Sequence, residues 1–232
     1  MAWSFAFTAQ PGPGKSVCQD SVAVHQEGDR IVIAISDGAG SARHGDIAAA
    51  LATESALELQ DLLWKGEWKE IIGEIQCRLR QIAAGKSLED FACTLVLASV
   101  AENGLRMLQV GDGGGVARTR DELHWLGTPP GEYMNVTTFL HEPKSIARAA
   151  FICEDEIPEA ICLFSDGLQH LVVDPLSGKI HAPFFGRVFS VPTQPGQDSR
   201  ASEWLAQMAQ SEPVRKRTND DIGIAVARRF ET

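Results

Sequence analysis

The chain has 232 residues, of which 44% are hydrophobic and 22% are charged, so it can bury a sizeable core like an ordinary globular protein. Its formal net charge of −10 opposes non-specific binding to nucleic acid and to anionic membranes. The apolar runs are too short to span a bilayer, and the first residues lack the basic and apolar regions of a signal peptide. Because no Pro/Gly/Ser-rich linker divides the chain, we expect one domain over residues 1–232. The cysteine usage predicts that the protein is cytoplasmic.

The cysteines fit the same compartment. They are odd in number, scattered, and without a Cys-x-x-Cys pair. This usage predicts reduced thiols rather than a disulfide framework or a zinc site.

The first third of the chain predicts three strands followed by two helices. Residues 3–9, 21–25 and 31–35 are rich in β-branched, aromatic or small apolar residues. Helical spacing then predicts amphipathic helices over residues 45–64 and 67–84. Two successive helices without an intervening strand argue against a doubly wound parallel sheet. The stripe expected to be buried on the first helix is Ile47, Leu51, Ser55, Leu59 and Leu62 or Leu63.

The middle of the chain predicts four short strands in an antiparallel meander with hairpin-type turns. The strand ranges are 91–100, 105–110, 115–119 and 123–126. The run from Gly111 to Gly115 is predicted to be one of the hairpins, because a phosphate-cradling loop would need a helix after it. Residues 128–141 contain Pro129, Pro130 and Gly131 and predict an irregular surface loop.

The last third predicts further strands and two helices around a segment, residues 174–198, that has no clear pattern. The strand ranges are 145–153, 160–164 and 222–227, and the helix ranges are 167–173 and 201–210.

Two of the predicted strands end in the same tripeptide, Ser-Asp-Gly, which places Asp37 and Asp166 at strand ends. Gly38 allows the backbone after Asp37 to turn sharply and its carbonyl group to approach a bound ion. Further carboxylates flank strands or turns at Asp20, Asp112 and Asp220. We expect these aspartates to meet around divalent metal, and oxygen-only ligands favour Mg²⁺ or Mn²⁺ over zinc.

From Lys15 to Ala227, the ordered motifs resemble the metal-dependent protein phosphatases of the 2C family, in a short bacterial-type form. The family's Arg followed by Glu-Asp is matched loosely by Lys15 and Gln19-Asp20. Asp-Gly is a common turn dipeptide, so the order and strand context of the motifs carry the resemblance. The family's Asp-Gly-x-Gly, Gly-(Ser/Thr)-Thr, Gly-Asp-Ser, Ser-Asp-Gly and Asp-Asn-x-(Thr/Ser) motifs correspond to residues 37–40, 92–94, 111–113, 165–167 and 220–223.

The resemblance implies an α+β fold, a four-layer αββα sandwich of two antiparallel β-sheets flanked by helices. It implies a protein serine/threonine phosphatase in which water bridging two Mn²⁺ or Mg²⁺ ions attacks the phosphoryl group. The implied partners are a phosphorylated protein substrate and a cognate Ser/Thr kinase, without nucleic acid or membrane.

The resemblance also assigns metal ligands. Asp37 bridges both ions, the Gly38 carbonyl binds one of them, and Asp166 and Asp220 complete the other. Asp220 and Asp221 are alternatives by register, since side chains alternate along a strand, and the motif alignment favours Asp220.

Three other matched residues have roles around these ions. Asp20 holds metal-bound water, and Asp112 serves a weaker third ion. Lys15 stands at the position of the phosphate-binding arginine and offers a point charge in place of a bidentate fork. The implied catalytic residues are Asp37, Lys15 and Asp20.

The chain departs from the family pattern at three positions. Gln19 replaces a glutamate, which removes a charge and should lower affinity at the second metal. Ala39 replaces a histidine proposed as general acid, for which His44 is a weak substitute. Gly113 replaces a serine, and the carboxylate of that turn remains.

These departures leave other functions open. Gln19 and Ala39 fit a catalytically silent relative that binds a phosphoprotein or a partner kinase. A small-molecule or haloacid-dehalogenase-like phosphohydrolase would need Asp-x-Asp after its first strand, and no strand here is followed by that motif.

Overall fold

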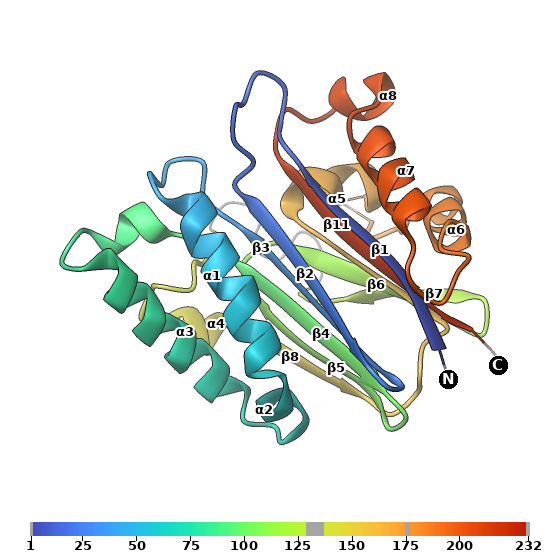
Figure 1. The fold of residues 1–232 in the computed structure, drawn as a ribbon, viewed down its shortest axis with the longest axis horizontal. Coiled ribbons are helices and arrows are strands. Elements are labelled where there is room, and N and C mark those ends of the chain that lie inside the picture. The colour runs from blue at the N-terminus through green and yellow to red at the C-terminus, as the bar shows by residue number, and fades with distance from the viewer. Residues whose placement is uncertain (1, 129–136, 175–176, 231–232) are drawn as a thin grey trace.

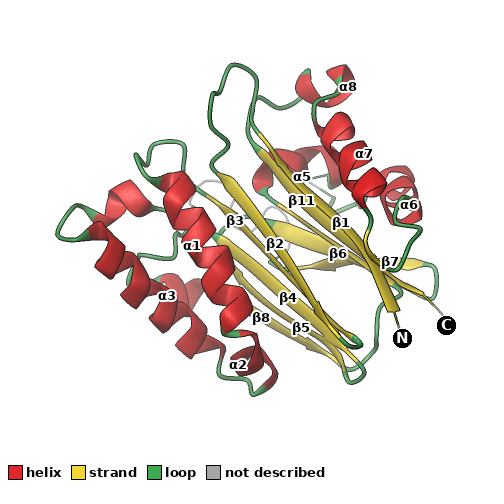
Figure 2. Ribbon diagram, in the orientation of Figure 1, coloured by secondary structure: helices red, strands yellow, loops and turns green. Residues whose placement is uncertain are grey.

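The computed structural model describes residues 2–128, 137–174 and 177–230, in which two β-sheets pack face to face between two layers of helices (Figures 1 and 2). This arrangement confirms the predicted α+β fold with four layers and two largely antiparallel sheets. Both described chain ends lie on the same side of the molecule (Figure 1).

The first sheet is antiparallel throughout. Its strand β3 is buried on both faces, because Ile31 and Ile33 face the second sheet while Val32 and Ala34 face the helices. Such a strand reads as a continuous apolar run in the sequence. The strand order is β2 (Asp20–Glu27), β3 (Arg30–Asp37), β4 (Leu95–Ala101), β5 (Gly104–Val110) and β8 (Ala150–Glu154).

The second sheet is antiparallel except for a short parallel pairing between β1 and β10. Its long strands β1 and β11 pair over their whole length, from Ala2 opposite Phe230 to Gln10 opposite Ile222. The strand order is β10 (Gly196–Gln197), β1 (Ala2–Gln10), β11 (Ile222–Phe230), β9 (Ala160–Phe164), β6 (Gly114–Thr119) and β7 (Glu122–Leu126).

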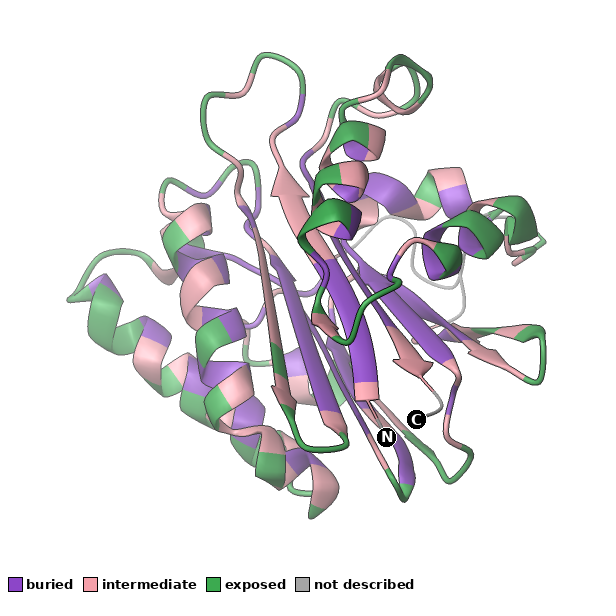
Figure 3. Cartoon of the chain, turned by 45° about the vertical axis from the view of Figure 1, so that its right-hand side comes forward, coloured by how far each residue is buried: buried purple, intermediate pink, exposed green. Residues whose placement is uncertain are grey.

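Each sheet has its own helical layer, so the core consists of three apolar layers, one between the sheets and one under each set of helices (Figure 3). None of the helices in residues 2–128, 137–174 and 177–230 combines the length and apolar character that a bilayer crossing needs. Over the first sheet lie α1 (Gly45–Glu58), α2 (Gln60–Trp64), α3 (Trp68–Ala83) and α4 (Ser145–Arg148), with the 3₁₀ helix η1 (Leu88–Phe91). Over the second lie α5 (Asp166–Val172), α6 (Ala182–Ser190), α7 (Ser199–Ala209) and α8 (Glu212–Arg215).

The predicted stripe is confirmed at Ser55 and Leu63, which are buried, and is wrong at its first residue. Ile47 is 50% exposed, and the residues in contact with the sheet are small. Short side chains let this helix lie close to β3, so the face that packs best is not the most hydrophobic one. The helix also ends at Glu58 rather than running on to residue 64, and α2 follows. The buried alanines of α1 are Ala48, Ala49, Ala52 and Ala56.

The predicted meander is wrong in one connection. The hairpins β4–β5 and β6–β7 belong to different sheets, and β5 does not pair with β6. The run from Gly111 to Gly115 is therefore a crossing between sheets and not a hairpin. Gly111 has a φ of +104°, and a Cβ on Gly113 would lie 2.8 Å from Val96 Cγ2, so glycine allows this tight passage.

Three other segments differ from the sequence prediction. Residues 145–148 form α4 before β8, because β5 offers pairing partners only from Gln109 opposite Ala150. Strand β4 begins at Leu95 and not at residue 91, since residue 91 belongs to η1 and Cys93 forms only an isolated bridge, with Gly38. Residues 174–198, for which the sequence has no clear pattern, contain α6 and β10. Residues 129–136 of the predicted loop lie outside the described residues.

Candidate metal centre

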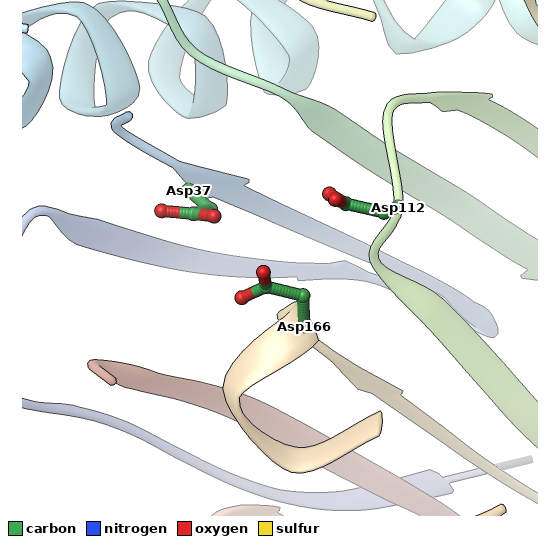
Figure 4. Close-up of side chains that lie close together, drawn as sticks. All are labelled: Asp37, Asp112 and Asp166. Carbon is green, nitrogen blue, oxygen red and sulfur yellow. The ribbon is translucent and has the colours of Figure 1, made fainter. Parts of the chain in front are cut away.

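Three carboxylates from distant segments meet where the two sheets end (Figure 4). Asp37 is the last residue of β3, Asp112 lies in the crossing between the sheets, and Asp166 is the first residue of α5. Each side chain offers an oxygen, and these oxygens all lie within 4.8 Å of one another. Figure 4 shows the carboxyl groups directed into a common space.

Strand pairing explains why these residues converge. Asp20 lies directly opposite Asp37 in the β2–β3 pair, and Gly114 lies opposite Phe164 in the β6–β9 pair, which brings the segments of Asp112 and Asp166 together. The antiparallel register therefore collects four aspartates at one end of the sandwich.

Hydrogen bonds hold the backbone of Asp37 and the carboxylate of Asp20. The Asp37 amide donates to the Thr94 hydroxyl over 3.0 Å, and the Thr94 amide donates to the Asp37 carbonyl over 2.9 Å. The Ser165 hydroxyl donates to Asp20 Oδ2 over 2.7 Å. Both Thr94 and Ser165 lie in the sequence motifs, but the motifs do not predict these roles, because a hydroxyl that contacts an aspartate across strands leaves no local pattern.

Burial and the repulsion between neighbouring carboxylates raise the pKa values of three aspartates at this site. Burial first, and then the charges of Asp20 and Asp166, raise the pKa of Asp37 to about 10. Burial, followed by the charges of Asp112 and Asp220, raises the pKa of Asp166 to about 7. Burial raises the pKa of Asp20 to about 6, although its hydrogen bond from Ser165 opposes the change.

The donor set fits a hard divalent cation. Asp112 Oδ1 is buried and has no hydrogen-bond partner among the described residues, while its other oxygen accepts a hydrogen bond from the Thr137 hydroxyl. An uncompensated buried carboxylate oxygen is costly unless it is paired or coordinates a metal. Carboxylate oxygens without His or Cys suit Mg²⁺ or Mn²⁺.

Asp220 lies beside this cluster and not within its 4.8 Å set. Its carboxylate is 48% exposed and accepts a hydrogen bond from Lys15 Nζ over 2.8 Å. Asp221, the alternative by register, is 2% exposed and accepts from Lys15 over 3.2 Å. Burial lowers the pKa of Lys15, but the two ion pairs outweigh it, and the pKa is raised. Lys15 thus stays charged at the edge of the carboxylate cluster.

Gln19 is directed toward the turn that follows β3. Its side-chain amide donates to the carbonyls of Ala42, over 3.1 Å, and Ala39, over 3.4 Å, and its backbone carbonyl accepts from the Gly38 amide. A Cβ on Gly38 would lie 2.4 Å from the Gly45 backbone, so this turn requires glycine there. Gln19 therefore holds the turn that carries the Gly38 carbonyl.

We expect Gln19→Glu to destabilise the protein without metal, although the family pattern has glutamate at this position. The new carboxylate cannot donate to Ala39 and Ala42, and it adds negative charge beside the cluster. The loss should be about 1–3 kcal/mol in the free energy of unfolding, measured by urea denaturation in EDTA. Gln26→Glu, at a half-buried residue on the far end of β2, is the matched control, and a Gln19→Glu protein as stable as this control would contradict the expectation.

The histidine considered as a substitute general acid packs on an aromatic ring. The ring centroids of His44 and Phe91 are 4.9 Å apart, and His44 precedes the first turn of α1. Ala39 is 9% exposed and packs with Ala42 and Ala92. The contacts of His44 in the described residues are those of a structural side chain.

Comparisons with known proteins agree on one family. The family model for protein phosphatase 2C matches residues 14–209. The chain is 29% identical to Serine/threonine-protein phosphatase 3 of Escherichia coli (strain K12) over 250 residues, covering 98% of each protein.

Solved structures show the same fold. PppA, a key regulatory component of T6SS in Pseudomonas aeruginosa, has a TM-score of 0.71 at 19% identity and covers 99% of both chains. RsbX in complex with magnesium has a TM-score of 0.62 at 14% identity and covers 98% of this chain and 95% of that one. At these identities the likeness concerns the fold alone.

Proposed function

Since the chain belongs to the protein phosphatase 2C family, we propose that it is a protein serine/threonine phosphatase that hydrolyses phosphoserine and phosphothreonine with the help of two Mn²⁺ or Mg²⁺ ions. The convergence of Asp37, Asp112 and Asp166 is the observation that carries this proposal. The proposed partners are a phosphorylated protein and a cognate Ser/Thr kinase, and the proposed compartment is the cytoplasm, which suits the free cysteines.

The ions would be held by carboxylates and one backbone carbonyl. The proposed ligands of the two ions are Asp37, the Gly38 carbonyl, Asp166 and Asp220. Asp37 and Asp166 belong to the carboxylate cluster, and in Figure 4 Asp166 lies between Asp37 and Asp112. When bound, two such ions lower the pKa of water between them and neutralise charge on the phosphoryl oxygens. Asp112 is the proposed ligand of a third, weaker ion.

The remaining groups position the substrate and the ligands. Lys15 Nζ, held by Asp220 and Asp221, is placed to donate to a phosphoryl oxygen as a point charge. Asp20 shares a hydrogen bond with Asp37 and accepts another from Ser165, so it orients the Asp37 carboxylate. Asp20 Oδ2 can also accept a proton from water that enters the site.

The proposal is tested by assaying p-nitrophenyl phosphate and a phosphothreonine peptide. We expect turnover of both with Mn²⁺, and no turnover after EDTA treatment until the ion is restored. A phosphotyrosine peptide of the same sequence serves as the specificity control. Absence of turnover with every substrate at millimolar Mn²⁺ or Mg²⁺ would reject the enzymatic function.

A silent binding module is the second candidate. It is favoured by the direction of Gln19, which faces backbone carbonyls and adds no charge to the cluster. Titration calorimetry separates the two functions, because a silent relative would bind a phosphothreonine peptide in EDTA and take up no Mn²⁺ at millimolar concentration.

A further inference from the structure

Asp221 is a buried carboxylate on which three donors converge. Its Oδ1 accepts from the Gly12 amide over 2.7 Å, and its Oδ2 accepts from the Gln19 amide over 2.7 Å. The third donor is Lys15 Nζ, 3.2 Å from Oδ1. The side chain is only 2% exposed, so these contacts replace its hydration.

The two amides belong to opposite ends of one loop. Gly12 follows β1 and Gln19 precedes β2, so the residues between them form the connection that carries Lys15. Figure 1 shows this connection reaching beyond the sheets at the end of the molecule where α8 lies. The carboxylate of Asp221 thus binds both ends of the loop and also contacts the ammonium group of Lys15 within it.

Other contacts fix the start of the same loop from outside. Arg215 donates to the Pro11 carbonyl over 2.9 Å and to the Asp220 carbonyl over 2.6 Å. A Cβ on Gly12 would lie 2.2 Å from the Asn219 carbonyl oxygen, so the two backbones are in close contact. These contacts hold the backbone around Asp221 in place. The long side chain of Lys15 is the group in this region that can still change its conformation.

We infer that Asp221 is a positioning residue that fixes Lys15 for phosphate binding, an inference that rests on the proposed function. A lysine has four rotatable side-chain bonds and a single point charge, so its placement depends on partners that hold it. Three donors need three acceptor lone pairs, and the two oxygens of a carboxylate together supply them. An asparagine would turn its NH₂ group toward one of the backbone amides and leave it without an acceptor.

The test compares Asp221→Asn with a matched control, Asp198→Asn. Asp198 is also 2% exposed and accepts from backbone amides, those of Ala201 and Thr193, but it caps the N-terminus of α7 and is not part of the loop. We expect Asp221→Asn to raise the inhibition constant of inorganic phosphate and the KM for p-nitrophenyl phosphate about tenfold, the loss of one charge-assisted contact. Asp198→Asn should lower Tm and leave both constants unchanged.

A double-mutant cycle asks whether Asp221 acts through Lys15. Lys15→Ala should weaken phosphate inhibition about tenfold in the native background and less than twofold in the Asp221→Asn background. Equal effects of Lys15→Ala in both backgrounds, or unchanged constants in Asp221→Asn, would overturn the inference. Asp221→Ser, which keeps one acceptor and removes the charge, replaces Asp221→Asn in the cycle if the amide variant does not fold.

Amide hydrogen exchange gives a readout that does not require activity. The Gly12 and Gln19 amides should exchange at least about tenfold faster in Asp221→Asn, since each loses a buried acceptor or its geometry. Unchanged exchange at both amides would overturn the inference even in an active enzyme. If the native protein shows no phosphatase activity, the proposed function fails while this exchange measurement still decides whether Asp221 closes the loop.

Discussion

Asp37→Asn is expected to abolish metal-dependent turnover and, at the same time, to stabilise the protein without metal. Asp37 is one of the three clustered carboxylates and the proposed ligand of both ions, and an amide brings neither its charge nor its second anionic oxygen to a cation. The loss of turnover should be roughly a thousandfold or more, corresponding to several kcal/mol of charge stabilisation.

The expected gain in stability has an electrostatic origin. Burial and the charges of Asp20 and Asp166 raise the pKa of Asp37 to about 10, so an ionised Asp37 opposes folding. An asparagine has nearly the same shape, is neutral, and can still donate a hydrogen bond to Asp20. Tm in EDTA should therefore rise relative to the native protein.

The measurement is kcat/KM with saturating Mn²⁺ together with calorimetric Tm in EDTA. Asp61→Asn is the matched control, because Asp61 is 72% exposed and pairs with Arg30 at the other end of the first sheet. Near-native turnover of Asp37→Asn would remove the basis of the proposed function. A fall in its Tm without metal would instead contradict the account of charge repulsion.

Stability without metal is expected to fall as pH rises from 5 to 8, and divalent ions are expected to reverse this trend. In the folded chain the pKa is raised to about 6 for Asp20, about 7 for Asp166 and about 10 for Asp37. Each group holds its proton more tightly in the folded than in the unfolded state, so the folded state binds more protons above pH 4. Stability is lost between the unfolded and the folded pKa, by at most about 1.4 kcal/mol per pH unit for each group.

Added cation should act in the opposite direction. Mn²⁺ binds the ionised carboxylates of the folded state, so its stabilising effect should be larger at pH 8 than at pH 5. The measurement is Tm between pH 5 and 8, with EDTA and with Mn²⁺, in the native protein and in Asp37→Asn. The slope in EDTA should be shallower in the variant.

The chosen pH range avoids the opposing titration of Asp198, although it includes that of His141, whose pKa is lowered by burial. Burial raises the pKa of Asp198, but hydrogen bonds from Thr193 and Ala201 outweigh it and lower that pKa, so its contribution is lost only when pH falls through the acid range. A Tm in EDTA that rises between pH 5 and 8, or an Mn²⁺ effect independent of pH, would contradict the proposed coupling of carboxylates in one centre.

The sequence by itself determined the local elements and the carboxylates at their ends. Strand β3 reads as a buried apolar run that stops at Asp37, and β9 reads as another that stops before Asp166, since burial on both faces and a following glycine are recorded in adjacent residues. The order of these motifs also predicted the fold class through a family resemblance, because many weak local signals in a fixed order are together specific.

Only the tertiary structure decided how these elements meet. Periodicity cannot tell which sheet a strand joins, so the crossing that carries Asp112 was predicted as a hairpin. Periodicity also cannot tell which of two adjacent aspartates before a strand is buried. Asp221 is buried against loop amides and Asp220 faces Lys15, because the pairing between β1 and β11 sets their register. Contacts between residues some two hundred positions apart depend on packing, and no pattern of neighbouring residues contains them.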